Sequence, residues 1–199
     1  MKAGNFFKTI KCVAIVAVSA LIAASCENKS SEQASGTDAA KEATAENEIK
    51  FENKKQEKDA RFLVDATAFN LEQIQLARLG EQKGNADIKK LSTMMLAEHE
   101  KALKEGSEMA KNKQITVPDT TTTGVQDSYK MLNDKNGNDF NTAFCDRLVE
   151  NHQKAVGFFE KESADSRDMD LKEWATAKLS DIRKHLDHIF ACQKKLEKK

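Results

Sequence analysis

Apolar residues recur at intervals of three, four and seven positions along most of residues 54–196. Phe62, Phe69 and Leu76 are the clearest case, because each stands seven positions after the one before. This spacing places apolar side chains on one face of a helix, whereas a half-buried strand would alternate them at every second residue. The single proline and the eight glycines leave long stretches free of helix breakers. The sequence therefore predicts an all-α fold.

The periodic stretches divide into four long helices and one long connection. The connection between the second and third helices has roughly 25 residues, with a short helix expected over residues 125–133. Long connections of this kind occur in ferritin-like folds. We therefore predict that residues 54–199 form a ferritin-like four-helix bundle of two antiparallel hairpins. The four helices are expected at about residues 54–80, 86–111, 140–159 and 171–196.

Residues 1–25 have the composition of a secretory signal peptide. Three lysines and no acid precede an apolar run of 13 residues at 12–24. That run is too short for a membrane-spanning helix, which needs about 20 residues. The following Ala23-Ala24-Ser25-Cys26 resembles a bacterial lipobox, in which Cys26 becomes the first mature residue and carries the lipid. The alternative is an ordinary secretion signal with an incidental cysteine.

Residues 26–53 predict a flexible tether that follows the lipidated Cys26. Small and charged residues predominate from Glu27 to about Asn47, and no aromatic or large aliphatic residue occurs there. Glu27 differs from the aspartate of the familiar inner-membrane retention signal, so we expect a lipid anchor in the outer membrane, facing the periplasm or the cell surface.

The charge of the chain gives little indication of a partner. Loss of residues 1–25 leaves a formal charge of −3 without a basic face, which argues against nucleic acid. The membrane is the expected partner through the lipid anchor, and no particular protein partner is indicated.

Four polar side chains stand at positions where a helical bundle needs apolar ones. His99 and His152 have almost only apolar neighbours three and four positions away. Three of the four such neighbours of Glu72 are apolar, and two of the four of His185 are. Each of the four helices thus contributes one such residue, and we expect the four to meet at one level of the bundle. Buried carboxylates and imidazoles need shared protons, hydrogen bonds or a metal ion.

These four side chains predict a site for one divalent transition metal ion, with Glu98 or Asp181 as helpers. Three imidazoles and one carboxylate suit zinc, copper, nickel or a single iron. A di-iron centre is disfavoured, because Leu96 and Val149 interrupt the Glu-x-x-His motif that it needs. The alternative is a buried polar network that only fixes how the helices pack.

Cys145 and Cys192 are the two cysteines left in the mature chain after Cys26. Cys145 lies seven residues before His152, and Cys192 lies seven residues after His185. In an antiparallel hairpin these offsets place the two cysteines at one level, about two helical turns from the histidines. In the oxidising envelope such a pair predicts a disulfide, and two buried free thiols are the alternative.

Seven short motifs spread over about Phe62–Leu196 form a recognisable pattern. They are Glu72, Ala97-Glu98-His99, Ile115–Pro118, Leu132–Asn141, Val149–His152, Phe159-Glu160 and Lys184–Leu186. Together they resemble the family called domain of unknown function 4142, whose members are often labelled predicted outer membrane proteins. The resemblance implies a ferritin-like helical domain in the bacterial envelope and carries no established reaction with it.

The motifs of common enzyme classes are missing from the sequence. It contains no nucleophile elbow, no glycine-rich phosphate loop and no CxxC pair. We therefore predict no catalytic residue and no organic cofactor. The sequence favours a role without enzymatic activity. The expected function is that of an envelope lipoprotein whose helical domain binds a metal ion through core His and Glu. The alternative is a structural or protein-interaction module of the envelope without a metal.

Overall fold

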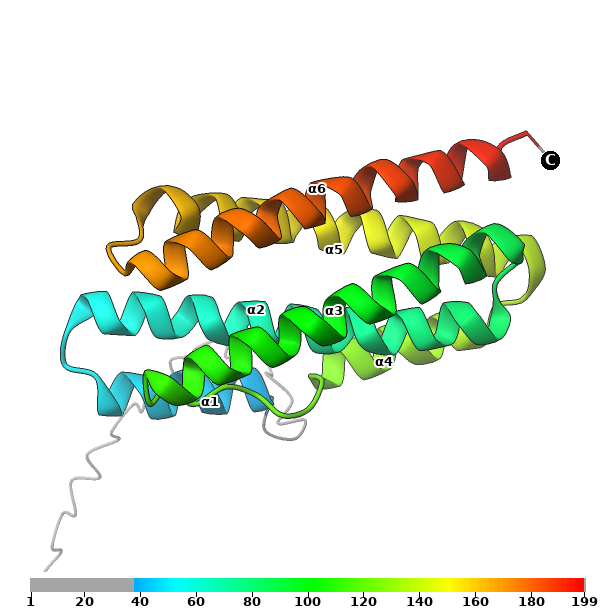
Figure 1. Cartoon of the computed structure of the whole chain (residues 1–199). Coiled ribbons are helices and arrows are strands. Elements are labelled where there is room, and N and C mark those ends of the chain that lie inside the picture. The colour runs from blue at the N-terminus through cyan, green and yellow to red at the C-terminus, as the bar shows by residue number, and fades with distance from the viewer. Residues whose placement is uncertain (1–37, 199) are drawn as a thin grey trace, which may run out of the picture. The chain divides into compact units, whose positions relative to one another are not determined.

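The computed structural model describes residues 38–198, and within this range the chain is helical with no strand (Figure 1). The signal peptide, the lipobox and Cys26 lie outside the described residues. No helix between residues 38 and 198 combines the length and the apolar character needed to span a bilayer. The helices are α1 (Ala39–Lys50), α2 (Lys54–Lys83), α3 (Ala86–Asn112), α4 (Thr123–Asn133), α5 (Gly137–Asp165) and α6 (Met169–Leu196).

The four long helices form two hairpins, α2 with α3 and α5 with α6, and the hairpins pack against each other (Figure 1). Side-chain caps fix where the helices begin. Asn85 accepts a hydrogen bond from the backbone of Ile88 at the start of α3, and Asp168 accepts one from Leu171 at the start of α6. The helices expected from the periodicity are therefore confirmed, including the short α4 in the connection.

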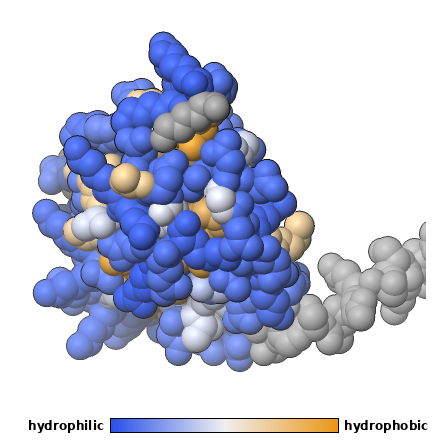
Figure 2. Space-filling view, turned by 90° about the vertical axis from the view of Figure 1, so that its right-hand side faces the viewer, coloured by the Kyte–Doolittle hydropathy of each residue, from blue (hydrophilic) through white to orange (hydrophobic). Residues whose placement is uncertain are grey.

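The core consists of two apolar clusters, one toward each end of the hairpins. The first contains the rings of Phe62, Phe159 and Trp174, with Phe62 edge-on to the other two. The second contains Phe140 and Phe144, whose rings stack. The outer surface is dominated by hydrophilic residues on the face shown in Figure 2, and hydrophobic residues appear there only in small separate places.

Helix α1 corrects the prediction that residues 26–53 are a tether, because Ala39–Lys50 are folded onto the domain. The Asn47 amide donates to the carbonyl oxygen of Thr116 at 2.7 Å and accepts from its backbone N–H at 2.9 Å. Only Ala43 and Asn47 are buried on this helix. The prediction failed because α1 docks mainly through polar contacts, which leave no apolar periodicity in the sequence.

Candidate metal centre

Three histidines from three helices meet at the level between the two apolar clusters. His99 lies on α3, His152 on α5 and His185 on α6, and all three are buried. One ring nitrogen from each lies within 4.8 Å of those of the other two. On α5, Leu148 of one cluster lies one turn before His152, and Ala155 of the other cluster lies just after it.

The hydrogen bonds of His152 show which of its nitrogens carries the proton. Nδ1 lies 2.9 Å from the backbone oxygen of Leu148, which can only accept, so Nδ1 is the donor. Burial, together with the charge of His185, lowers the pKa of His152 to about 3. The ring is therefore neutral at physiological pH, and its Nε2 is a bare lone pair.

His99 is held in the same way by Asn70 of α2. The Asn70 amide nitrogen donates to the backbone oxygen of Ala66 at 2.7 Å, which turns its oxygen toward His99. His99 Nδ1 lies 2.9 Å from that oxygen and donates to it. Burial holds the pKa of His99 well below its usual value. Its Nε2 is thus a bare lone pair, and it is buried without a hydrogen-bond partner among residues 38–198.

His185 completes the set through its contact with Glu98 of α3. His185 Nε2 lies 2.6 Å from a carboxylate oxygen of Glu98, and its N–H donates a hydrogen bond to that oxygen. Burial lowers the pKa of His185, although Glu98 opposes this shift. In the neutral ring Nδ1 is bare, and it lies 3.3 Å from the bare Nε2 of His152. Two lone pairs at this distance repel each other unless a cation lies between them.

The His152–His185 pair has the spacing that a tetrahedral metal ion requires, and the three rings together offer nitrogens within 4.8 Å of one another. Metal–nitrogen bonds of about 2.0–2.1 Å place ligand nitrogens roughly 3.4 Å apart, close to the spacing of the His152–His185 pair. Each ring donates its other N–H to a fixed oxygen, as metal-binding histidines generally do. The Phe69 ring lies edge-on to His99 and to His152, with centroids 5.3 Å away in both cases, and holds the two rings in place.

A small cavity adjoins the cluster on the side of His99 and His185. Its volume is about 20 Å³, which is enough for one water molecule. Three charged residues also line it, namely Glu98, Lys178 and Asp181. Glu98 and Asp181, expected as helpers, therefore both lie beside the histidines, and Asp181 forms ion pairs with Lys178 and Lys184.

The comparison with known protein families agrees with the resemblance seen in the sequence. Residues 33–192 of the 199 match the family described as domain of unknown function (DUF4142). The chain belongs to the DUF4142 family. The matching segment contains the three clustered histidines and both hairpins except the last turn of α6. No curated protein and no solved structure matches the chain.

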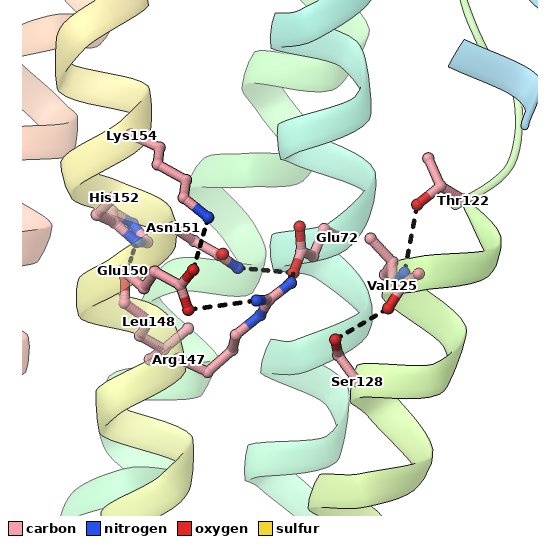
Figure 3. A network of polar contacts seen from close by, with 11 residues as sticks. Glu72, Thr122, Val125, Ser128, Arg147, Leu148, Glu150, Asn151, His152 and Lys154 are labelled. Carbon is pink, nitrogen blue, oxygen red and sulfur yellow. Dashed lines mark hydrogen bonds and ion pairs between the residues drawn. The ribbon is translucent and has the colours of Figure 1, made fainter. Parts of the chain in front are cut away.

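Glu72, which the sequence suggested as a fourth ligand in this DUF4142 chain, does not join the three histidines. Its Oε1 accepts from Arg147 Nε at 3.0 Å, from Arg147 Nη2 at 2.7 Å and from Asn151 Nδ2 at 2.7 Å. Figure 3 shows this network between α2 and α5, with Lys154 and Glu150 on its outer side. Glu72 is therefore the partner of an arginine, and its apolar surroundings in the sequence were misleading.

Asn70 is the residue of the histidine cluster that sequence reasoning missed. It is buried on α2 and orients His99 through the hydrogen bond described above. The signal was weaker than for His99 and His152, because Thr67 and Gln73 stand beside Ala66 and Ile74 among the neighbours of Asn70 on its helix face. Glu72 was singled out on the same helix because Ala68, Phe69 and Leu76 stand beside it.

The predicted disulfide of the DUF4142 domain is not formed, and Cys145 and Cys192 are free buried thiols. The two thiols do lie within hydrogen-bonding reach of each other, as their offsets from the histidines suggested. Burial, assisted by the neighbouring Cys192, raises the pKa of Cys145 to about 12. Because only the thiolate reacts in disulfide formation, this environment protects the reduced form.

Proposed function

We propose that this protein is a bacterial envelope lipoprotein whose ferritin-like helical domain binds one divalent transition metal ion through His99, His152 and His185. The observation that carries the proposal is that three buried histidines bring one ring nitrogen each within 4.8 Å of one another, while each ring keeps one nitrogen without a proton. A purely structural network requires a donor for each buried acceptor, and His99 Nε2 has none within the described range. One metal ion would satisfy all three lone pairs at once.

Neutral imidazoles are ligands for zinc, copper(II), nickel and iron(II). Zinc suits the centre best, because tetrahedral sites with three protein nitrogens and one water are a common zinc arrangement. The hydrogen bond between His185 and Glu98 supports this choice, since a carboxylate behind a ligating imidazole increases its basicity and fixes its orientation.

Metal analysis of the chain from residue 27 onward tests the centre. We expect one zinc ion per chain after reconstitution, and removal by a chelator should be reversible. His99→Ala and His152→Ala should weaken binding by more than roughly a hundredfold, because loss of a hydrogen-bond partner behind a metal ligand alone costs about 10–100-fold. Asn70→Leu removes such a partner and should fall within that smaller range.

The matched control is His188→Ala, which removes an exposed histidine of α6 three residues after His185. It should bind metal as the unaltered chain does. If zinc, copper, nickel and iron all fail to bind or to raise the melting temperature, the metal centre is rejected and the structural role of the bundle remains.

The envelope location is supported by the first 26 residues of the sequence. The ferritin-like assignment is supported by the two hairpins and the long connection between α3 and α5. We expect the full chain, expressed in a bacterium, to incorporate labelled palmitate and to fractionate with the outer membrane. Cys26→Ser should abolish labelling. Labelling that persists in this variant, or its absence from the unaltered chain, would exclude lipidation at Cys26.

A further inference from the structure

The three histidines supply only three of the four ligands that a tetrahedral ion requires. No carboxylate or thiol of residues 38–198 joins them at ligand distance. The nearby Glu98 carboxylate already accepts the N–H of His185 at 2.6 Å and acts behind that ring. The fourth ligand must therefore come from outside the chain, and the cavity of about 20 Å³ beside His99 and His185 is the space that can receive it.

Lys178 places a cation on the wall of this cavity. Its side chain is 13% exposed and is held by Glu105 at 2.9 Å and by Asp181 at 3.8 Å. Glu105 is fixed in turn by the indole N–H of Trp174 at 3.0 Å. The ammonium group of Lys178 is thus held in position by contacts with residues of α3 and α6.

The remainder of the cavity limits what can enter. Phe69, Ala102 and Ile182 form an apolar wall that leaves room for few atoms. Glu98 and Asp181, with side chains 49% and 39% exposed, connect the cavity with the surface. About 20 Å³ holds one water molecule or hydroxide but no bulky organic ligand, and a small linear anion bound end-on to the metal would extend from it toward the surface beside Glu98 and Asp181.

We propose that the metal centre keeps an open coordination position in this cavity, where it binds water or a small inorganic anion beside Lys178. This inference rests on the proposed function. Glu98 and Asp181 also place two carboxylates on this cavity, so the ligand class follows from the divalent ion and the Lys178 ammonium group, whose three positive charges outweigh them. Lys178 is a binding residue for that anion and takes no part in holding the metal.

The test uses the Co(II)-substituted chain from residue 27 onward, because the visible bands of Co(II) report directly on its ligands. We expect azide and thiocyanate to shift these bands with saturation at one anion per cobalt, and benzoate, which is too large, to leave them unchanged. Lys178→Met should weaken azide binding by roughly tenfold or more, as the loss of a nearby charge predicts. The matched control is Lys184→Met, which removes another Asp181 partner from α6 outside the cavity.

The possible outcomes separate this inference from the proposed function. If cobalt binds with one ion per chain and azide leaves its spectrum unchanged, the open position is rejected and the metal centre stands. Equal azide affinity in the unaltered chain and in Lys178→Met rejects the role of the lysine. If cobalt and zinc both fail to bind to a chain with an unchanged helical circular-dichroism spectrum, both proposals fail together.

Discussion

Acidification from pH 7 to pH 4 is expected to lower the unfolding free energy of the metal-free protein by about 3 kcal/mol through His152 alone. Burial lowers the pKa of His152 to about 3, so the folded ring stays neutral over this range. In the unfolded chain the ring takes up a proton as the pH falls below about 6.5. The contribution of His152 to the unfolding free energy is therefore fully present above pH 6.5 and is lost progressively on acidification. The lowered pKa values of His99 and His185 act in the same direction.

Urea unfolding at pH 7, 6, 5 and 4 in the presence of a chelator measures this effect. The unaltered chain should lose about 1.4 kcal/mol per pH unit more than His152→Gln between pH 6 and pH 4, which corresponds to one proton. The exposed His188 gives the control variant His188→Gln, which should keep the steep dependence. Parallel curves for the unaltered chain and His152→Gln would show that the buried ring is already protonated in the folded state.

Two buried carboxyl groups act in the opposite direction and must be separated from the histidines. Burial raises the pKa of Asp59 and of Glu162, so these groups stabilise the folded state when protonated, and that contribution is lost as the pH rises through their folded pKa values. Both are present in every variant compared. Their contribution therefore cancels when the pH dependence of His152→Gln is subtracted from that of the unaltered chain.

The elements that sequence alone predicted are those with a repeating apolar signal. Helices α2, α3, α5 and α6 bury one face along most of their length, so each turn repeats the pattern. His99, His152 and His185 were found because they interrupt that pattern with polar groups, which bundles bury only when partners are present. The convergence of these three rings followed from their common depth along the helices.

What the sequence could not predict depends on single polar contacts between distant residues. Helix α1 is docked by the pairing of Asn47 with Thr116, 69 positions away. The spacing of apolar residues in the sequence does not indicate such a polar pair. The partners of a buried polar group are equally hidden. Glu72 and Asn70 lie two positions apart on α2, yet one faces Arg147 and the other faces His99. A rotation of 200° around the helix axis separates two such positions, and a single sequence does not tell which partner lies on either side.

Arg147→Met is expected to destabilise the domain by about 3 kcal/mol, at the lower end of the range for breaking a buried ion pair. The Glu72 side chain is 13% exposed and that of Arg147 is 24% exposed, so the pair is only partly hydrated. Of the two side chains that donate hydrogen bonds to the Glu72 carboxylate, only the Asn151 amide is left when the arginine is lost. Urea unfolding at pH 7 measures the loss.

The double variant Glu72→Gln, Arg147→Met should recover part of that stability. A neutral amide does not need the lost cation, and its oxygen can still accept from Asn151. The coupling free energy between the two substitutions should be about 1–3 kcal/mol, the range for residues in direct contact. Additive losses would show that the ion pair contributes nothing of its own.

Metal content of the same variants decides between the two roles considered for Glu72. Because Glu72 lies outside the histidine cluster, both variants should bind one zinc ion per folded chain with unchanged affinity. A weaker affinity in the double variant than in Arg147→Met would instead make Glu72 a metal ligand, as its position in the sequence suggested. Stability and metal binding are thus expected to respond to different residues: the Glu72–Arg147 ion pair joins α2 to α5, and the three clustered histidines lie outside it.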